Sequence, residues 1–369
     1  MEITASRAEL LDALDRVIGG VEKRQTMPIL GNLLLEVSDD YLKLTGTDLE
    51  IQLESGCPVQ VGQPGKTTIN ARKLHEIVRA LPTGSQIRLR QESSSIVVQA
   101  GQSVFRLGSL PADEFPRMED TTEEYRLAIP QNYLRSLLEK TQFSMAQQDV
   151  RYFLNGLLLE MSPERIRCVA TDGHRLALAE TDHEQAIGET MSIIVPRKMV
   201  LELMRALDRD DETPVELAVS NQQIELTLGQ QRMVSKLIDG RFPDYERVIP
   251  KNNSKQVHVD RETLKQVLQR AAVLNTDRFA GAQYHLQPDR LTVEAINSDQ
   301  ESSREDIPVH YQGEDLKIAF NISYLLAILS HLEDMQVRMD FETPESSALI
   351  QPTAEKTIRT RYVLMPMKI

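Results

Sequence analysis

Residues that can carry acid–base chemistry stand close together in the middle of the sequence, at Asp172, His174 and Arg175. An aspartate can orient a histidine, and a histidine exchanges protons near neutral pH. No nucleophile with a partner base stands out around them. An enzyme with a site between repeated segments remains an alternative, but we predict no catalytic residue.

A second candidate motif, at residues 63–68, reads QPGKTT and resembles the end of a phosphate-binding loop. Such a loop needs another glycine five residues before Gly65, so that backbone N–H groups can surround a phosphate. Position 60 is Gln60, and Pro64 has no N–H to donate. We therefore interpret the motif as a turn before a strand.

The two cysteines, Cys57 and Cys168, are far apart and indicate neither a disulfide framework nor a metal cluster. His174 and His183 lack the cysteine or carboxylate spacing of a metal site, so we predict no metal and no cofactor. No apolar run approaches the roughly 18–20 residues of a membrane span. The N-terminus has no apolar signal core. These features favour a reducing cytoplasm.

The charges are segregated along the chain. The formal net charge of −13 argues against DNA binding by bulk electrostatics. However, two predicted helices begin with adjacent basic residues at equivalent places, Arg72-Lys73 and Arg197-Lys198. A single basic helix face is usually only a solvated surface, whereas its repetition predicts a functional basic face.

The elements that position these residues come from an internal repeat. Residues 154–178 read as strand, turn, strand, polar turn and strand, with Gly173 where a positive φ is easiest. Residues 30–53 repeat the pattern, with Thr47-Asp48 in place of Thr171-Asp172. Residues 284–299 repeat it more weakly. A repeat this long indicates that the chain is built from repeated structural units.

The flanks of each copy also repeat. An amphipathic helix precedes each copy, starting near Ser6, Pro130 and Asp260, where Ser6 and Glu9 form a capping-box pattern. A second helix and alternating strands follow each copy. We predict three α+β domains at residues 1–122, 123–252 and 253–369. The alternative is one large α+β enzyme with fortuitous internal similarity.

Seven runs, in order along the chain, resemble the bacterial DNA polymerase III β subunit family, the sliding clamps. They are MPILGNLLLEV, LTGTDLE, QFSMAQQDVRYFLNG, VATDGHRLAL, VPRKMVLELMR, SKLIDGRFPDYERVIPKN and YVLMPMKI. The resemblance implies three clamp domains, each with two helices packed on antiparallel sheets. It also implies that two chains form a head-to-tail ring of six domains, with the helices facing inward.

The function implied by this resemblance is that of a non-catalytic processivity factor, which encircles duplex DNA and slides on it without reading sequence. The implied partners are the clamp loader complex, the polymerase III catalytic subunit, translesion polymerases, mismatch-repair proteins and DNA ligase, which bind through short peptides. A monomeric scaffold with clamp-like domains and no role on DNA remains an alternative.

The resemblance and the basic helix starts together indicate which residues face DNA. Phe153 stands where a tyrosine is common in the family, and core packing is the alternative role for Tyr152 and Phe153. The candidate residues are Arg24, Arg72, Lys73, Gln148, Tyr152, Phe153, Arg197 and Lys198.

The resemblance also implies a pocket for partner peptides. Its apolar members would form an adaptable groove, and Arg175 and Asn321 would anchor an extended peptide. Glu345 stands where an apolar residue is frequent, and Lys368 where arginine is frequent. The matching residues are Leu154, Thr171, Gly173, His174, Arg175, Leu176, Pro243, Arg247, Val248, Phe279, Asn321, Tyr324, Ser347, Val363, Met365, Pro366 and Met367.

The implied dimer interface joins Phe105 and Leu107 of one chain to Val273 and Leu274 of the other. Basic residues common in the family near the first pair are replaced by Gln102 and Val104. The facing acidic run is diluted to ESSRE at residues 301–305. We therefore predict a more apolar dimer contact with less dependence on salt.

Overall fold

We describe the protein from a computed structural model that covers residues 1–21, 27–119, 125–183, 188–274, 281–354 and 356–368. The chain forms two compact units. The first contains residues 1–131 and 201–237, and the second contains residues 132–200 and 238–369. The repeat does not coincide with these units, because the second copy contributes strands to both.

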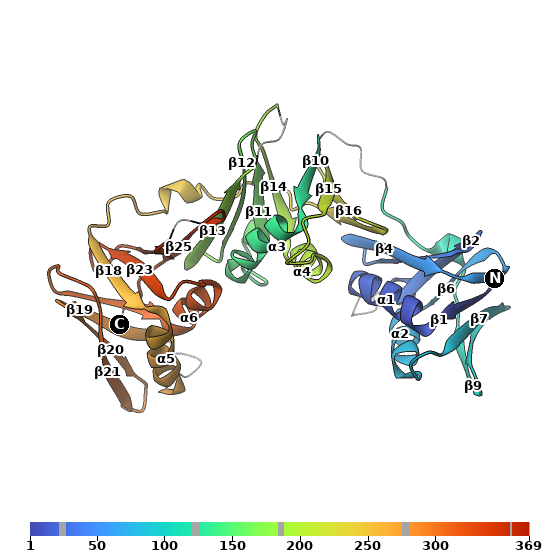
Figure 1. The fold of residues 1–369 in the computed structure, drawn as a ribbon, viewed down its shortest axis with the longest axis horizontal. Helices are drawn as coiled ribbons and strands as arrows, with labels where there is room; N and C mark the ends of the chain where they lie inside the picture. Colours follow the sequence, from blue (N-terminus) through green and yellow to red (C-terminus); the bar gives the residue numbers. More distant parts are fainter. Residues whose placement is uncertain (22–26, 120–124, 184–187, 275–280, 355, 369) are drawn as a thin grey trace. The chain divides into compact units, whose positions relative to one another are not determined.

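The first unit contains an eight-stranded antiparallel sheet in the order β10-β15-β16-β17-β4-β3-β2-β6 (Figure 1). Its centre is a joint between two copies of the repeat, where Met233 of β17 lies opposite Leu53 of β4. The strands are β2 (Asn32–Ser38), β3 (Tyr41–Thr47), β4 (Ile51–Pro58), β6 (Gly65–Asn70), β10 (Tyr125–Pro130), β15 (Pro214–Val219), β16 (Gln223–Leu228) and β17 (Gln231–Lys236).

A five-stranded sheet completes the first unit in the order β5-β1-β7-β8-β9, with β9 at one edge. Its strands are β1 (Glu2–Ser6), β5 (Gln60–Gln63), β7 (Gln86–Glu92), β8 (Ser95–Ala100) and β9 (Ser103–Gly108). Helices α1 (Arg7–Val17) and α2 (Ala71–Ala80) pack on each other. The Ser6 side chain accepts from the Glu9 N–H and donates to its carboxylate, which confirms the predicted cap.

The second unit contains the other joint. Its eight-stranded sheet has the order β14-β11-β12-β13-β25-β24-β23-β18, and Leu176 of β13 lies opposite Val363 of β25. The strands are β11 (Gly156–Met161), β12 (Arg165–Thr171), β13 (Arg175–Asp182), β14 (Met191–Pro196), β18 (Lys255–Asp260), β23 (Gln336–Phe341), β24 (Ala348–Pro352) and β25 (Arg359–Leu364).

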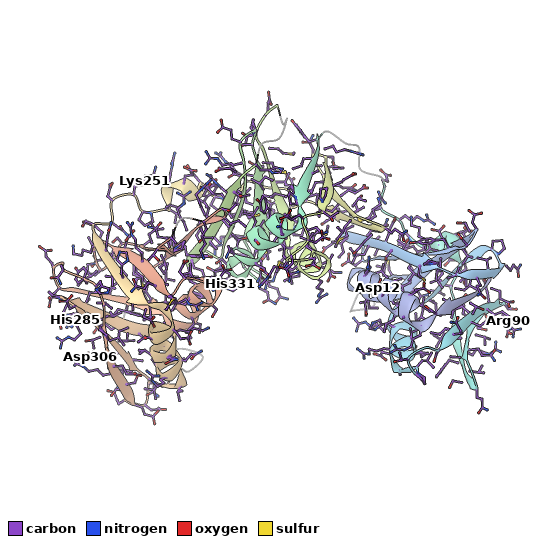
Figure 2. All side chains as sticks on the ribbon, in the orientation of Figure 1. Asp12, Arg90, Lys251, His285, Asp306 and His331 are labelled. Carbon is purple, nitrogen blue, oxygen red and sulfur yellow. The ribbon has the colours of Figure 1, made fainter. Side chains whose placement is uncertain are left out.

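A four-stranded sheet in the order β21-β20-β19-β22 leaves β21 at an edge, and Figure 2 labels Asp306 on that strand. Its strands are β19 (Gly281–Gln287), β20 (Arg290–Ile296), β21 (Ser302–Pro308) and β22 (Leu316–Asn321). Helices α5 (Arg261–Ala271) and α6 (Ile322–His331) pack on each other within a largely apolar core. Helices α3 (Gln131–Glu139) and α4 (Arg197–Ala206) begin directly after Pro130 and Pro196, which end strands.

The polar turn of the repeat has the same hydrogen bonds in its first two copies. The Thr171 hydroxyl donates to the Arg175 carbonyl oxygen at 2.7 Å, and the Thr47 hydroxyl donates to that of Ile51 at 2.7 Å. Gly173 has φ 89°, as the sequence predicts. Leu49 has the same place in copy one and also a positive φ, 73°.

Among the helices of the described residues, none is long and apolar enough to cross a membrane. Cys57 and Cys168 are both buried free thiols.

Candidate functional site

A mostly apolar cavity of about 240 Å³ opens in the second unit, where the turn between β12 and β13 meets the end of β25. Two short 3-10 turns, at Tyr152–Leu154 and Tyr245–Arg247, contribute the remaining walls. The lining residues are Arg151, Phe153, Leu154, Thr171, Gly173, Arg175, Leu176, Pro243, Tyr245, Val248, Val363 and Met365.

The glycine of the β12–β13 turn leaves the cavity open. A Cβ atom at Gly173 would come within 2.9 Å of the Arg151 guanidinium nitrogens. Asp172 stiffens this turn, because its Oδ1 accepts from the N–H groups of His174 and Arg175 at 2.9 and 3.0 Å. The sequence therefore provides a rigid wall with no side chain at its tip.

Arg175 is a fixed cation at the edge of the cavity. Its guanidinium lies over the rings of Tyr324 and Phe143, at 4.5 and 5.4 Å from their centroids. It donates to the Phe143 carbonyl oxygen at 2.7 Å and to Asp172 at 3.0 Å. The His174 ring stacks on Tyr324 at 6.2 Å. This arrangement offers aromatic faces and a positive charge whose position is already fixed before a ligand arrives.

The floor of the cavity is rigid and its mouth is adaptable. Leu154, Leu176 and Val363 are almost fully buried. Met365 at the mouth is 40% exposed, and Met367, which follows it outside the lining, is 38% exposed. Hydrogen bonds from their backbone N–H groups to the carbonyl oxygens of His174 and Ala319 hold the chain in place. Exposed methionines beside a buried apolar floor suit a variable apolar side chain of a bound peptide.

The structure brings together part of the predicted pocket. Arg247 points to solvent and pairs with Asp244 at 2.7 Å, Ser347 does not line the cavity, and Phe279 lies outside the described residues. His174, Asn321, Tyr324, Pro366 and Met367 do not line it either, although His174 and Tyr324 stack beside Arg175. The predicted residues that do line it are Leu154, Thr171, Gly173, Arg175, Leu176, Pro243, Val248, Val363 and Met365.

Two lining residues, Arg151 and Tyr245, were missed by sequence reasoning. Both lie inside runs that carry the family resemblance, so the signal was present without an assigned role. Phe153, which was predicted to face DNA, lines this cavity and packs against its apolar cluster.

The candidate DNA-facing residues lie mostly on exposed surfaces. Arg72 and Lys73 are exposed in the first turn of α2, whereas Arg197 is half-buried and donates to the Met145 carbonyl oxygen at 3.3 Å. Lys198 is also half-buried. Gln148 is exposed and Tyr152 is 58% exposed, on the segment that leads into the cavity wall. Arg24 lies outside the described residues.

A groove of about 460 Å³ lies in the first unit between α2 and β9. Ile77, Leu81, Phe105 and Leu107 provide its apolar walls, and Lys73 stands at the same groove. Val273 belongs to a 3-10 turn (Ala272–Leu274) in the second unit and is 81% exposed. Phe105, at 37%, and Val273 are large apolar side chains in contact with water.

Three domain descriptions of one family match nearly the whole chain. These are the N-terminal, central and C-terminal domains of the DNA polymerase III beta subunit, at residues 1–119, 128–244 and 246–368. The beta sliding clamp of Escherichia coli K12 is 43% identical over the full length of both chains. The chain belongs to the DNA polymerase III β subunit family.

Solved structures of sliding clamps agree with this membership. A Pseudomonas aeruginosa clamp is 41% identical with a TM-score of 0.95, and a Caulobacter crescentus clamp is 36% identical with a TM-score of 0.92. Both cover all of this chain and all of their own. Another P. aeruginosa clamp structure is described as bound to griselimycin.

Membership of the DNA polymerase III β subunit family confirms the fold class and the function predicted from the sequence. The chain has three sliding-clamp domains and is a non-catalytic processivity clamp of DNA polymerase that tethers partner proteins.

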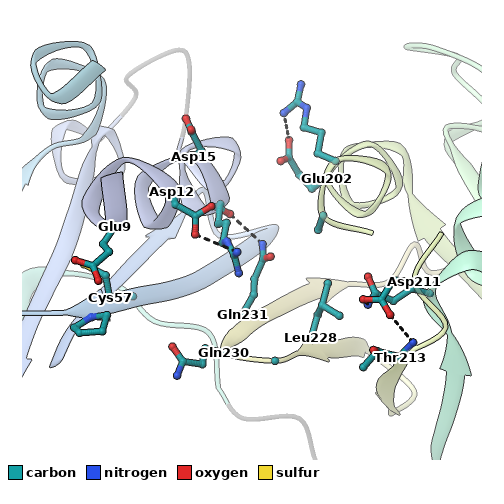
Figure 3. A pocket seen from close by; sticks show the side chains of 17 residues that line it. Glu9, Asp12, Asp15, Cys57, Glu202, Asp211, Thr213, Leu228, Gln230 and Gln231 are labelled. Atoms are coloured by element: carbon teal, nitrogen blue, oxygen red, sulfur yellow. Dashed lines mark hydrogen bonds and ion pairs between the residues drawn. The ribbon is translucent and has the colours of Figure 1, made fainter. Parts of the chain in front are cut away.

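A larger cavity of about 830 Å³ lies in the first unit of this β subunit (Figure 3). Its walls carry Glu9, Asp12 and Asp15 of α1 and Glu202 of α4. Cys57 lies in the wall, and burial, with Glu9 and Asp12 nearby, raises the pKa of its thiol to about 12. A thiol held protonated in this way is a poor nucleophile.

Proposed function

We propose that two copies of this chain close into a ring around duplex DNA and hold partner proteins by short peptides in the cavity beside Gly173. The strand pairing inside the chain carries the proposal. In both joints, the last strand of one copy pairs with the strand that follows the polar turn of the preceding copy, as β17 pairs with β4 and β25 with β13.

The same pairing rule leaves two strands of this chain available to pair with strands of a second chain. β9 is the last strand of copy one, which has no preceding copy, and β21 follows the polar turn of copy three. Each stands at the edge of its sheet. Pairing β9 of one chain with β21 of another, twice, gives a closed assembly without exposed strand edges at the joints.

The apolar side chains at these edges support the same contact. Val273 and Leu274, just after α5, are suited to fill the groove formed by Ile77, Phe105 and Leu107. Burial of an apolar side chain of this size stabilises by roughly 1.5–3 kcal/mol. We infer that these residues form the centre of the dimer interface.

The DNA-facing surface binds DNA weakly, because it carries acidic as well as basic side chains. Arg72, Lys73, Arg197 and Lys198, with Arg24, Gln148 and Tyr152, contact phosphates without reading bases. The exposed face of α1 carries Glu9, Asp12 and Asp15, which limit the net attraction. A ring stays on DNA because it is linked around it, so weak contacts are sufficient and permit sliding.

We also propose domain boundaries at residues 1–122, 123–252 and 253–369, and a location in the bacterial cytoplasm, where the chromosome is replicated. The peptide cavity would serve the clamp loader, the polymerase III catalytic subunit, translesion polymerases, mismatch-repair proteins and DNA ligase.

Peptide binding is tested by fluorescence polarisation with a clamp-binding peptide of the polymerase III catalytic subunit. Met365→Ala removes apolar contact at the mouth, and we expect an affinity about tenfold lower. Met335→Ala is the matched control, because Met335 is 81% exposed and does not line the cavity. Equal affinities of wild type and Met365→Ala would contradict the assignment.

A further inference from the structure

A second cavity, of about 550 Å³, lies on the other side of Tyr245 from the peptide cavity. Tyr245 lines both cavities, and its neighbours in sequence divide between them: Pro243 lines the peptide cavity, whereas Asp244 and Glu246 line the second one. A chain that leaves the peptide cavity past this 3-10 turn therefore enters the second cavity within a few residues.

The wall between the cavities is rigid. The Tyr245 hydroxyl donates to the Glu160 carboxylate and accepts from Arg167 at 2.6 Å. The Arg167 guanidinium also lies over the Tyr245 ring, 5.8 Å from its centroid. Tyr245 as a whole is 7% exposed. The second cavity is therefore already formed before a ligand binds. Tyr245 is the wall that it shares with the peptide cavity.

The carboxylates outnumber the available cations in the second cavity. Arg167 contacts the buried carboxylate of Glu180 from two nitrogens, at 2.7 and 2.8 Å, and Arg165 reaches the same carboxylate at 3.6 Å. Glu180 is also reached by Arg359 and Arg361, at 3.6 and 3.5 Å, so it offsets only part of the charge of the other two arginines. The lining of the cavity nevertheless carries four carboxylates against two arginines, and these carboxylates are Glu160, Glu164, Asp244 and Glu246.

The remaining charge in the cavity is negative. Glu160 and Glu246 share Arg167, at 3.6 and 3.0 Å. Within the described part of the chain, Asp244 pairs with Arg247, whose side chain is 86% exposed, and such exposed pairs are weak. Glu164 adds a further exposed carboxylate to the lining. A cation would find several acceptors here, whereas an anion would be repelled by the four carboxylates of the lining.

We propose that this second cavity binds a lysine or arginine side chain of the partner, located a few residues outside the peptide segment that docks beside Gly173. The proposal rests on the proposed peptide site and extends it. Its occupant is the flanking part of the same partner peptide, because the shared Tyr245 wall places the two cavities side by side and the carboxylates complement a basic residue. Partners with basic flanks would then be favoured over partners with acidic flanks.

The test compares three forms of one clamp-binding peptide: the core peptide, the core extended at either end by Ser-Lys-Ser-Lys, and the core extended by four serines. Affinities are measured by fluorescence polarisation on the full-length protein at low and high salt. We expect one lysine extension to bind wild type about fivefold more tightly than the serine extension. We also expect most of that gain to be lost at 0.5 M salt, roughly as screening predicts.

The double variant Glu164→Gln/Glu246→Gln should bind the core peptide like wild type but lose the gain from lysine. Glu314→Gln is the control, since the Glu314 side chain is 91% exposed and lies outside both cavities. A core peptide that binds while lysine adds nothing, or a gain that persists in the double variant, overturns the second site alone. A core peptide that fails to bind wild type overturns the peptide site and this inference together.

Discussion

Gly173 and Leu49 hold the same position in two copies of one hydrogen-bonded turn, and both have positive φ values, 89° and 73°. The Leu49 side chain packs against the buried cluster that contains Ile29, Leu30 and Phe115. Gly173 has no side chain, and the peptide cavity opens beside it. One residue therefore distinguishes a filled turn in copy one from an open turn in copy two.

We predict that Gly173→Ala weakens peptide binding by several-fold. The new Cβ would meet the Arg151 guanidinium at 2.9 Å and displace it in the cavity. A residue other than glycine at this φ also costs about 1 kcal/mol of folding free energy. Thermal unfolding and peptide titration measure the two effects separately.

The matched control is Gly101→Ala. Gly101 also has a positive φ, 56°, but a Cβ there meets nothing within 4 Å. It should lower the free energy of unfolding similarly and leave peptide affinity unchanged. Equal losses of peptide affinity in the two variants would show that strain alone, and not the cavity, is responsible.

We predict that Phe105→Arg and Val273→Asp each convert the dimer to monomer at micromolar concentration. Both changes place a charge in the proposed apolar contact, where it would be desolvated without a partner. Sedimentation velocity measures the change. Val150→Asp is the control, because Val150 is 95% exposed and lies in neither interface segment; a dimer that survives both interface changes would rule out this interface.

We further predict that dimerisation depends little on salt. Two charged residues on the edge strands already have partners within the chain: Arg106 pairs with Glu92 at 2.7 Å, and Glu305 pairs with Arg270 at 2.6 Å. These pairs reduce the charge that the edge strands offer to the other chain. The dimer dissociation constant should change less than about threefold between 0.05 and 0.5 M salt. A change of a hundredfold would contradict an apolar contact.

Acid should loosen the β13–β25 joint. Burial alone would raise the pKa of Glu180, but the hydrogen bond from Arg167 and the charges of Arg167, Arg361 and Arg359 outweigh it and lower that pKa. A lowered folded-state pKa means that the contribution to stability is complete above the unfolded value near 4.5 and is lost as pH falls through the folded value.

Hydrogen exchange of β25 should therefore accelerate as the pH falls from 5 to 3, after correction for the intrinsic rate. Glu180→Gln should exchange faster at pH 7 and change less with pH. If the wild-type and Glu180→Gln proteins have the same pH profile, Glu180 does not hold the joint.

Local features of this fold were predictable from the sequence because neighbouring residues determine them. The cap at Ser6, the cap at Asp260 and the positive φ of Gly173 all follow from residue type and position. The joints β17–β4 and β13–β25 were not predicted, because strand edges far apart in sequence carry no local mark of their partner.

The peptide cavity was predictable only in part. Apolar residues such as Leu154 and Val363 have the same pattern in a core as in a groove, so only the family resemblance singled them out. Tyr245 was missed because its role depends on the two cavities that it separates, and its hydroxyl bonds to Glu160 and Arg167 are tertiary contacts. Phe153 was predicted to face DNA from the family resemblance, which could not reveal that the residue also lines the peptide cavity.

The basic helix starts should matter for retention on DNA. Arg197→Glu/Lys198→Glu reverses two charges at the start of α4, and we expect faster loss from circular DNA as salt increases, because phosphate contacts are electrostatic. Arg90→Glu is the control, since Arg90 lies on strand β7 and not on a helix, and is labelled in Figure 2.

Retention on nicked circular DNA is the most direct test of the account. Protein loaded by the clamp loader should stay on the circle through gel filtration at a salt concentration that abolishes ordinary binding, and should leave within minutes once a restriction enzyme linearises the circle. Protein that is not retained on the circle, or that stays equally well on the linear form, would contradict a ring that encircles the duplex.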